Sequence, residues 1–249
     1  MLKYLAAIAV LASPVGAEEL NYSAFPGNGK FSFDIGLGVK AGPSYPGSDE
    51  MDAGVWVPLR NVHFGEGDKI RRDGFSFGPD FGYVGERDSS DDDDLAGLDD
   101  IDRAIEVGGR VSFVRGPVTS YATSRVGLGG HSGVTGEIGM RYHMDINDRL
   151  SLSSGLEVDY GNAEFVDTYF GVSAEEAARS RYSEYDAGGG FSKASAKVSM
   201  RYSLSELTSV LGEFEYGRLI GDAADSPIVQ DRDQPVIRIG ITRNISLNF

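Results

Sequence analysis

Several things that are scarce in this 249-residue sequence already limit its structure. It contains no cysteine, as expected in a reducing compartment or in an exported protein that avoids disulfide chemistry. After the N-terminus no apolar run is long enough for a transmembrane helix, which needs about 20 residues. Lys and Arg total 23 against 38 Asp and Glu. The resulting net charge of −15 argues against nucleic acid or an anionic lipid surface as the main partner.

Signals of catalysis are equally scarce. The three histidines, His63, His131 and His143, share no metal-ligand spacing. No Gly-x-Ser-x-Gly elbow is present, and the glycine-rich stretch 127–130 lacks the lysine of a phosphate-binding loop. We therefore expect a protein that is not an enzyme and binds no cofactor.

The N-terminus has the pattern of an export signal. Lys3 supplies a positive charge, Leu5 to Ala12 an apolar segment, and Val15-Gly16-Ala17 a small-residue cleavage site. We expect residues 1–17 to be a signal peptide and residues 18–249 to form one outer-membrane barrel domain.

The chain does contain segments in which apolar and polar residues alternate. From Val134 to Met144, and again from Leu150 to Tyr160, every second residue is apolar or small and most of the residues between are polar. A period of two is typical of β-strands. The abundance of glycine (34), tyrosine (12) and phenylalanine (13) favours long strands with aromatic girdles over a soluble α/β enzyme.

The same unit recurs along the chain and predicts an all-β, antiparallel transmembrane β-barrel of ten strands. If residues 164–172 form part of an extra pair, the number is twelve. Pro79 predicts a bulge or local unpairing in its strand, and Ser173 with Glu176 predicts a short capped helix within a loop. The expected strands are residues 31–41, 53–62, 75–83, 105–113, 118–128, 134–144, 150–160, 188–202, 210–216 and 237–249.

Connection lengths alternate as well. Residues 42–50, 85–102, 161–186 and 221–235 are long connections, whereas 116–117, 145–149 and 203–206 are short; residues 64–73 are the exception. Long extracellular loops and short periplasmic turns are typical of outer-membrane barrels. The alternative is a soluble sandwich with its apolar face buried, but the export signal and the long strands favour the barrel.

In a barrel the apolar face meets lipid and the polar face lines the lumen. Ten strands leave a narrow lumen, which charges of both signs can close by salt bridges, so a wide diffusion pore is not expected. The predicted lumen charge network is Asp34, Glu106, Arg110, Glu137, Arg141, Glu157, Asp159, Lys193, Lys197, Arg201, Glu213 and Glu215.

The connection from Glu86 to Asp102 is strongly acidic and includes the run Asp91, Asp92, Asp93 and Asp94. Such a run is a solvated loop rather than part of a core or a membrane span. The four aspartates are also candidates for divalent-cation binding, although they lack EF-hand spacing.

Three short stretches stand out, with the residues Pro43, Tyr45, Gly47 and Ser48; Tyr169, Phe170, Gly171 and Val172; and Gly221, Asp222, Ser226 and Pro227. They resemble the MipA/OmpV family of outer-membrane proteins, and the resemblance runs over essentially the whole mature chain. It implies an outer-membrane location, no catalytic residues, and a scaffold that joins a murein hydrolase to a murein synthase, or else a role in adhesion or antibiotic response. The alternative function is a narrow channel or uptake protein.

The C-terminal residue, Phe249, also fits this family, whose barrels commonly end in an aromatic that the barrel assembly machinery reads. The sequence departs from the family at the Asp91–Asp94 run and at Leu247, where an aromatic is common. The expected partners are outer-membrane lipid, the assembly machinery and murein enzymes.

Overall fold

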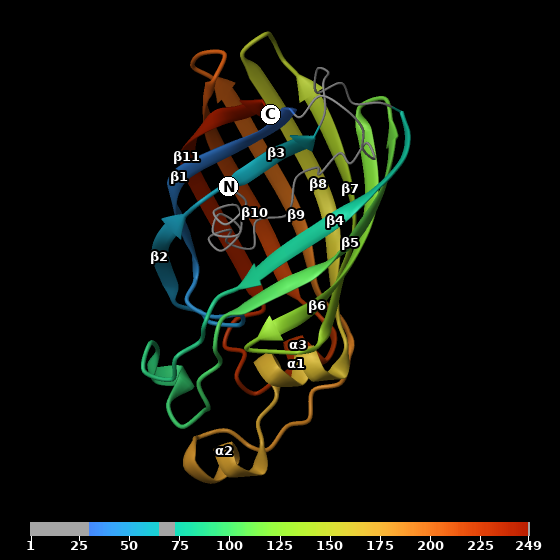
Figure 1. The fold of residues 1–249 in the computed structure, drawn as a ribbon. Coiled ribbons are helices and arrows are strands. Elements are labelled where there is room, and N and C mark those ends of the chain that lie inside the picture. Colours follow the sequence, from blue (N-terminus) through green and yellow to red (C-terminus); the bar gives the residue numbers. More distant parts are fainter. Residues whose placement is uncertain (1–29, 65–72, 249) are drawn as a thin grey trace.

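A computed structural model describes residues 30–64 and 73–248 of the chain. The predicted signal peptide and Phe249 lie outside these residues. The described chain folds into one long antiparallel sheet that curls into a barrel, with short helices at one end (Figure 1). None of these helices is long and apolar enough to cross a membrane.

The sheet confirms the predicted fold class. Its strands are β1 (Lys30–Pro43), β2 (Met51–Trp56), β3 (Leu59–Phe64), β4 (Gly74–Val84), β5 (Ala104–Arg115), β6 (Val118–Gly129), β7 (Val134–Asp145), β8 (Leu150–Gly161), β9 (Gly190–Ser203), β10 (Thr208–Leu219) and β11 (Asp233–Asn248). The hydrogen-bonded order within the described part is β2-β1-β11-β10-β9-β8-β7-β6-β5-β4, and β3 also pairs with β1.

The sheet therefore has ten strand positions, but eleven strands occupy them. The single strand expected over residues 53–62 is wrong: it is divided into β2 and β3, which both pair with β1. Pro58 lies at the division, and its carbonyl oxygen accepts a hydrogen bond from the Gly36 N–H. Because proline has no N–H, an uninterrupted strand would lose a ladder bond there.

The bulge or local unpairing expected at Pro79 is also wrong. Pro79 lies opposite Gly109 in an unshifted register between β4 and β5. In the described part of the sheet β4 is the last strand in the order. An edge strand tolerates proline, because one of its sides has no neighbour to which an N–H must donate.

The two faces of the sheet differ as a transmembrane barrel requires. Leu37, Val55 and Leu156 are 66%, 64% and 63% exposed on the outside, whereas charged side chains on the opposite face are buried. Glycine lets neighbouring strands approach closely. A Cβ at Gly38 would lie 2.2 Å from the backbone oxygen of Ile239, so a larger residue would force β1 and β11 apart.

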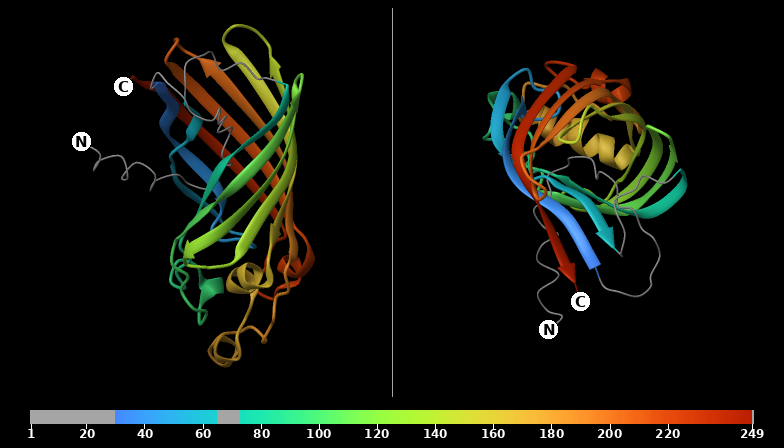
Figure 2. Two further views of the ribbon diagram at one scale, coloured as in Figure 1. Left: turned by 45° about the vertical axis from the view of Figure 1, so that its right-hand side comes forward. Right: turned by 90° about the horizontal axis from the view of Figure 1, so that it is seen from above.

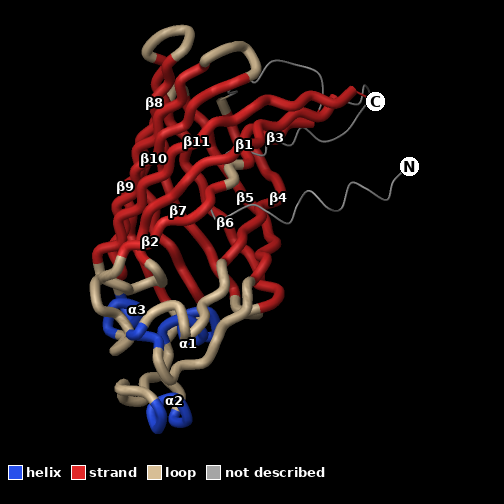
Figure 3. The backbone as a smooth tube through the Cα atoms, turned by 90° about the vertical axis from the view of Figure 1, so that its left-hand side faces the viewer, coloured by secondary structure: helices blue, strands red, loops and turns tan. Residues whose placement is uncertain are grey.

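The long connections and the short turn 130–133 gather at one end of the barrel. They form what we call the cap, residues 44–50, 85–103, 130–133, 162–189 and 220–232 (Figure 3). It contains α1 (Ala163–Phe170), α2 (Ala174–Arg179), α3 (Gly221–Asp225) and the 3-10 helix η3 (Asp93–Leu95). The other end has the short turns, residues 116–117, 146–149 and 204–207.

Helix α2 confirms the predicted capped helix, but α1 overturns the expectation that residues 164–172 are loop or an extra strand. The Asn162 side chain caps α1 by accepting from the Phe165 N–H. Val166, Tyr169 and Phe170 are buried at a spacing of three and four residues, which is helical periodicity. The sequence of so short a stretch does not distinguish a helix from a strand, because the distinction depends on which residues pack against it.

Candidate functional site: the charged lumen and the cap

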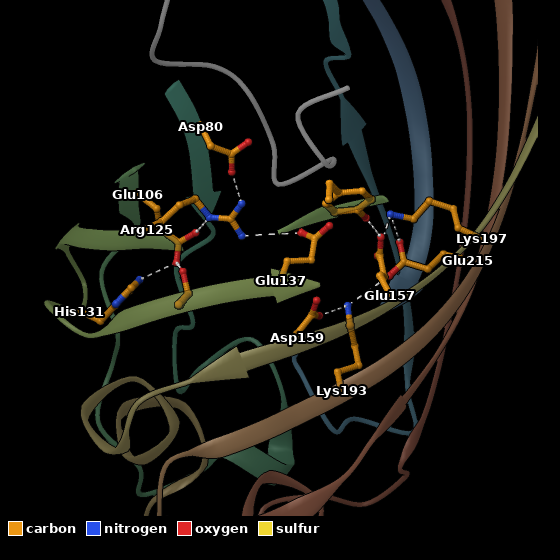
Figure 4. Close-up of polar contacts among 12 residues, drawn as sticks. Asp80, Glu106, Arg125, His131, Glu137, Glu157, Asp159, Lys193, Lys197 and Glu215 are labelled. Atoms are coloured by element: carbon orange, nitrogen blue, oxygen red, sulfur yellow. Dashed lines mark hydrogen bonds and ion pairs between the residues drawn. The ribbon is translucent and has the colours of Figure 1, made fainter. Parts of the chain in front are cut away.

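A group of ion pairs centred on β10 lines the lumen. Glu215 lies 3.2 Å from Lys193 Nζ and 3.6 Å from Lys197 Nζ (Figure 4). It also accepts a hydrogen bond from Arg238 at 3.0 Å. Glu213 pairs with Arg238 at 2.6 Å and with Arg60. Both carboxylates are 5% exposed, so each is held by two or more cations in place of water.

The same group extends to β8. Lys193 also pairs with Asp159 at 3.1 Å, and Lys197 pairs with Glu157 at 3.0 Å (Figure 4). Glu157 accepts a further hydrogen bond from the Tyr121 hydroxyl at 2.9 Å. The chain of contacts thus runs from β11 to β6 through the interior.

A second group is centred on Arg125 of β6. Its guanidinium donates a hydrogen bond to Asp80 and a second one, of 2.9 Å, to Glu106 (Figure 4). Its Nη2 atom lies 3.9 Å from a Glu137 oxygen. Glu106 also accepts a 2.8 Å hydrogen bond from Thr135. Three carboxylates therefore converge on one guanidinium.

Of the four remaining predicted network residues, Asp34 pairs with Arg201, whereas Arg110 and Arg141 adjoin the first group through Tyr121, which donates to Glu157. Asp34 accepts hydrogen bonds from Arg201 at 2.8 Å and from Asn244 at 2.6 Å. Arg110 and Arg141 lie over the ring of Tyr121, with centroid distances of 3.9 Å and 5.7 Å. The twelve predicted residues thus occupy three regions of one interior rather than one cluster.

Sequence reasoning missed four central residues, Arg60, Asp80, Arg125 and Arg238. Three were detectable from period-two alternation, because each lies among polar or small residues on its strand's inner face. Arg125, for example, follows Thr119, Tyr121 and Thr123 at steps of two. Arg60 was not detectable, because the break at Pro58 restarts the alternation.

The cap has a hydrophobic core of its own, in two parts. One part packs α1 and α3 together, with buried Val166, Phe170 and Ala223. The other contains buried Tyr45, Leu95, Val172 and Ile228 from four separate connections. Burial raises the pKa of Tyr169 in α1 to about 12, so its hydroxyl stays protonated. These long connections are therefore folded rather than loose.

The three stretches that carry the family resemblance meet in this cap. The Tyr45 hydroxyl donates to the Ile228 carbonyl at 3.2 Å, and the Ser226 hydroxyl donates to the Phe170 carbonyl. The Gly47 N–H donates to the Gln234 side chain at 3.0 Å. Gly47 has φ of 103°, which favours glycine. Their shared role is to join connections that are far apart in sequence.

The other motif residues lie close by. Ser48 donates to Asp92, and Pro43 ends β1. Gly171 ends α1, and Val172 forms an isolated bridge with Tyr185. Asp222 accepts from the Gly188 N–H, Gly221 begins α3, and Pro227 follows Ser226 in the turn after α3.

The acidic run has structural contacts. Asp92 is buried, caps η3, and accepts hydrogen bonds from Ser44 and Ser48. Asp94 pairs with Arg181, whereas Asp91 and Asp93 are exposed. The described residues contain no group of three or more His, Cys, Asp or Glu side chains arranged to hold a metal ion. Divalent-cation binding by Asp91–Asp94 therefore stays a proposal without a preformed site.

Glu176 joins α2 to the acidic connection, residues 85–103, and its ionisation makes this contact sensitive to pH. Partial burial opposes ionisation, but hydrogen bonds from the backbone N–H groups of Asp99 and Ser173 hold the pKa of Glu176 below its usual range. Because the folded pKa is lowered, this stabilisation is present above the ordinary glutamate pKa. It is lost as pH falls through the folded value.

We expect Glu176→Gln to destabilise α2 by about 0.5–2 kcal/mol at pH 7, the range of lost helix caps. Hydrogen exchange at the Ala177 and Ser180 amides, which bond within α2, measures the loss. Glu175→Gln is the matched control, since Glu175 is exposed. A difference between wild type and Glu176→Gln that persists at pH 2 contradicts the assignment.

Comparison with known proteins gives a family match. The family model described as MltA-interacting protein MipA matches residues 35–245. YiaT of Escherichia coli (strain K12), named as an outer membrane protein, is 30% identical over 119 residues, which are 48% of this chain and 47% of YiaT. The chain spans about half the length of the curated relatives it matches.

Solved structures that resemble the fold share little sequence with it. A COG4313 outer membrane channel from Pseudomonas putida F1 has a TM-score of 0.45 at 8% identity, over 92% of this chain and 100% of the channel. OprG of Pseudomonas aeruginosa, an outer membrane protein, has a TM-score of 0.29 at 10% identity, over 94% of this chain and 98% of OprG.

Proposed function

The chain belongs to the MltA-interacting protein MipA family, and from that premise we propose that it is a non-enzymatic outer-membrane scaffold acting through protein–protein contact. Its partners are a murein hydrolase and a murein synthase, bound from the short-turn, periplasmic side. The family description names an interaction with MltA, which supports a function in protein–protein contact. Phe249, outside the described residues, is proposed as the signal read by the barrel assembly machinery.

The observation that carries the proposal is the filled interior. Glu213, Glu215 and their cations bridge β9, β10 and β11 inside the barrel, and the cap lies across one end (Figure 2). A barrel filled in this way is poorly suited to diffusion of solutes. A barrel with a filled interior can still bind other proteins at its two ends.

Photo-crosslinking tests the partner and the side together. A photoreactive residue replaces Ile146 or Leu204, which are exposed in the short turns, or Asp88, which is exposed in the cap. We expect adducts with murein hydrolase or synthase from the two turn positions and none from position 88. Murein-enzyme adducts from position 88 alone would place the contact at the cap end and contradict the proposal.

A narrow channel or uptake protein is the second candidate. Charges of both signs line the lumen, as they do in pores that pass small polar solutes. Single-channel recording in planar bilayers separates the two candidates. We expect wild-type protein to give no long-lived open level; a stable, ion-selective conductance would contradict a function as scaffold alone.

A further inference from the structure

The segment between β8 and β9, residues 162–189, lies over the mouth of the barrel at the cap end. It carries α1 and α2. Seen along the barrel, α1 lies within the outline of the strands, and the side views place it directly beyond their ends (Figures 1 and 2). It is therefore positioned to cover the lumen.

The contact between α1 and the barrel rim leaves buried polar groups unmatched. The His131 side chain is fully buried, and its ring centroid lies 5.0 Å from that of Phe165 and 5.7 Å from that of Tyr169. Within the described residues, His131 Nδ1, the Tyr169 hydroxyl and Arg87 Nε have no hydrogen-bond partner.

His131 Nε2 lies 3.4 Å from a Glu106 oxygen, longer than the roughly 3.2 Å limit of a well-formed N–H···O bond. An unmatched buried polar group destabilises the state that buries it and recovers hydrogen bonds once water reaches it. Unmatched groups on both sides of one contact therefore favour its separation.

Incomplete packing marks the same contact. A cavity of about 470 Å³ has walls from the rim and from the segment. Arg87 and Gly130 belong to the rim side, whereas Asp167, Thr168 and Gly171 belong to the segment. This space is partly open to solvent, so the rim and the segment touch over only part of their facing surfaces and lack the dispersion energy of the missing contacts.

The return arm of the segment contains three consecutive glycines, Gly188, Gly189 and Gly190. A Cβ at Gly189 would lie 2.5 Å from the Ala163 N atom, so this arm passes close to the start of α1. Glycines absorb large φ and ψ changes at little cost, which suits a hinge.

Other contacts hold the segment down. Val166 and Phe170 are buried in the cap core, the Tyr185 hydroxyl donates to the Asp222 carbonyl at 2.8 Å, and Arg87 donates to the Tyr169 carbonyl at 3.0 Å. The closed arrangement is consequently the major one.

We propose that residues 162–189 form a lid. It exchanges between the closed arrangement of this structure and an open one in which α1 leaves His131 and water enters the mouth of the lumen. The lid controls access to the Glu106–Arg125 group from the cap end. The inference rests on these contacts and holds for a scaffold or a channel alike.

Spin-label distance measurements in lipid vesicles test the lid, and the absence of native cysteine makes the labelling specific. The lid pair is Glu175→Cys with Asp49→Cys, both exposed. The reference pair is Asp49→Cys with Asp102→Cys, which lies in the cap outside the lid. We expect two distance populations for the lid pair and one for the reference pair. A single distance population for the lid pair, as narrow as that of the reference pair, would overturn the proposal.

Two conservative variants test the cause. Tyr169→Phe keeps the ring but removes an unmatched hydroxyl, so the open fraction should fall by about fivefold or more. Tyr185→Phe removes a hydroxyl that is hydrogen bonded in the closed state, so the open fraction should rise. Heat-modifiable gel mobility confirms that each variant is folded. Equal open fractions in Tyr169→Phe and wild type would refute the role of the unmatched groups.

Discussion

Replacing Leu156 by arginine is expected to prevent stable insertion of the barrel. Leu156 is 63% exposed on the outer face of β8, in the middle of a twelve-residue strand. An arginine that faces lipid near the bilayer midplane costs roughly 2–4 kcal/mol. Refolding yield in vesicles, read from heat-modifiable mobility, measures the effect, and Leu156→Met is the matched control.

The same position reports the orientation of the sheet. A lipid-soluble quencher should reach a label at position 156 and spare a label at position 141, because Arg141 lies over the Tyr121 ring inside the barrel. The reverse pattern would mean that the apolar face is buried and that the protein is a soluble sandwich.

Replacing Arg125 by leucine is expected to lower the free energy of unfolding by about 3–5 kcal/mol, the usual cost of breaking a buried ion pair on one side. Its guanidinium is bonded to Asp80 and Glu106, which are 1% and 4% exposed. Without Arg125 these carboxylates keep no cation within salt-bridge distance among the described groups, except His131 if it is protonated.

Urea titration in lipid vesicles gives this free energy. Arg115→Leu is the control, since Arg115 is exposed at the end of β5; its effect should stay within about 0.5 kcal/mol. Arg125→Lys should recover part of the loss by restoring the charge without the bidentate geometry. A loss no larger than that of Arg115→Leu would show that the ion pairs contribute nothing to stability.

The sequence predicted the barrel because one face of every strand must be apolar where it meets lipid. That requirement is local and repeats every second residue, so it can be read without a structure. It also predicted α2, because the capping contacts of Ser173 and Glu176 lie within four residues of each other. It could not predict α1: Val166, Tyr169 and Phe170 become a buried helical face only against α3 and Ile101.

The charged residues show the same division. Alternation alone assigned Glu157, Lys197 and Glu215 to the inner face. Which cation meets which carboxylate depended on strand register and on the curl of the sheet, as in the pairing of Arg60 with Glu213, 153 positions apart in the chain. The local period thus determined which face each side chain takes. Only the closed, three-dimensional arrangement decided the ion-pair partners, the meeting of the three family stretches and the placement of α1 over the lumen, because those contacts join residues that sequence spacing does not relate.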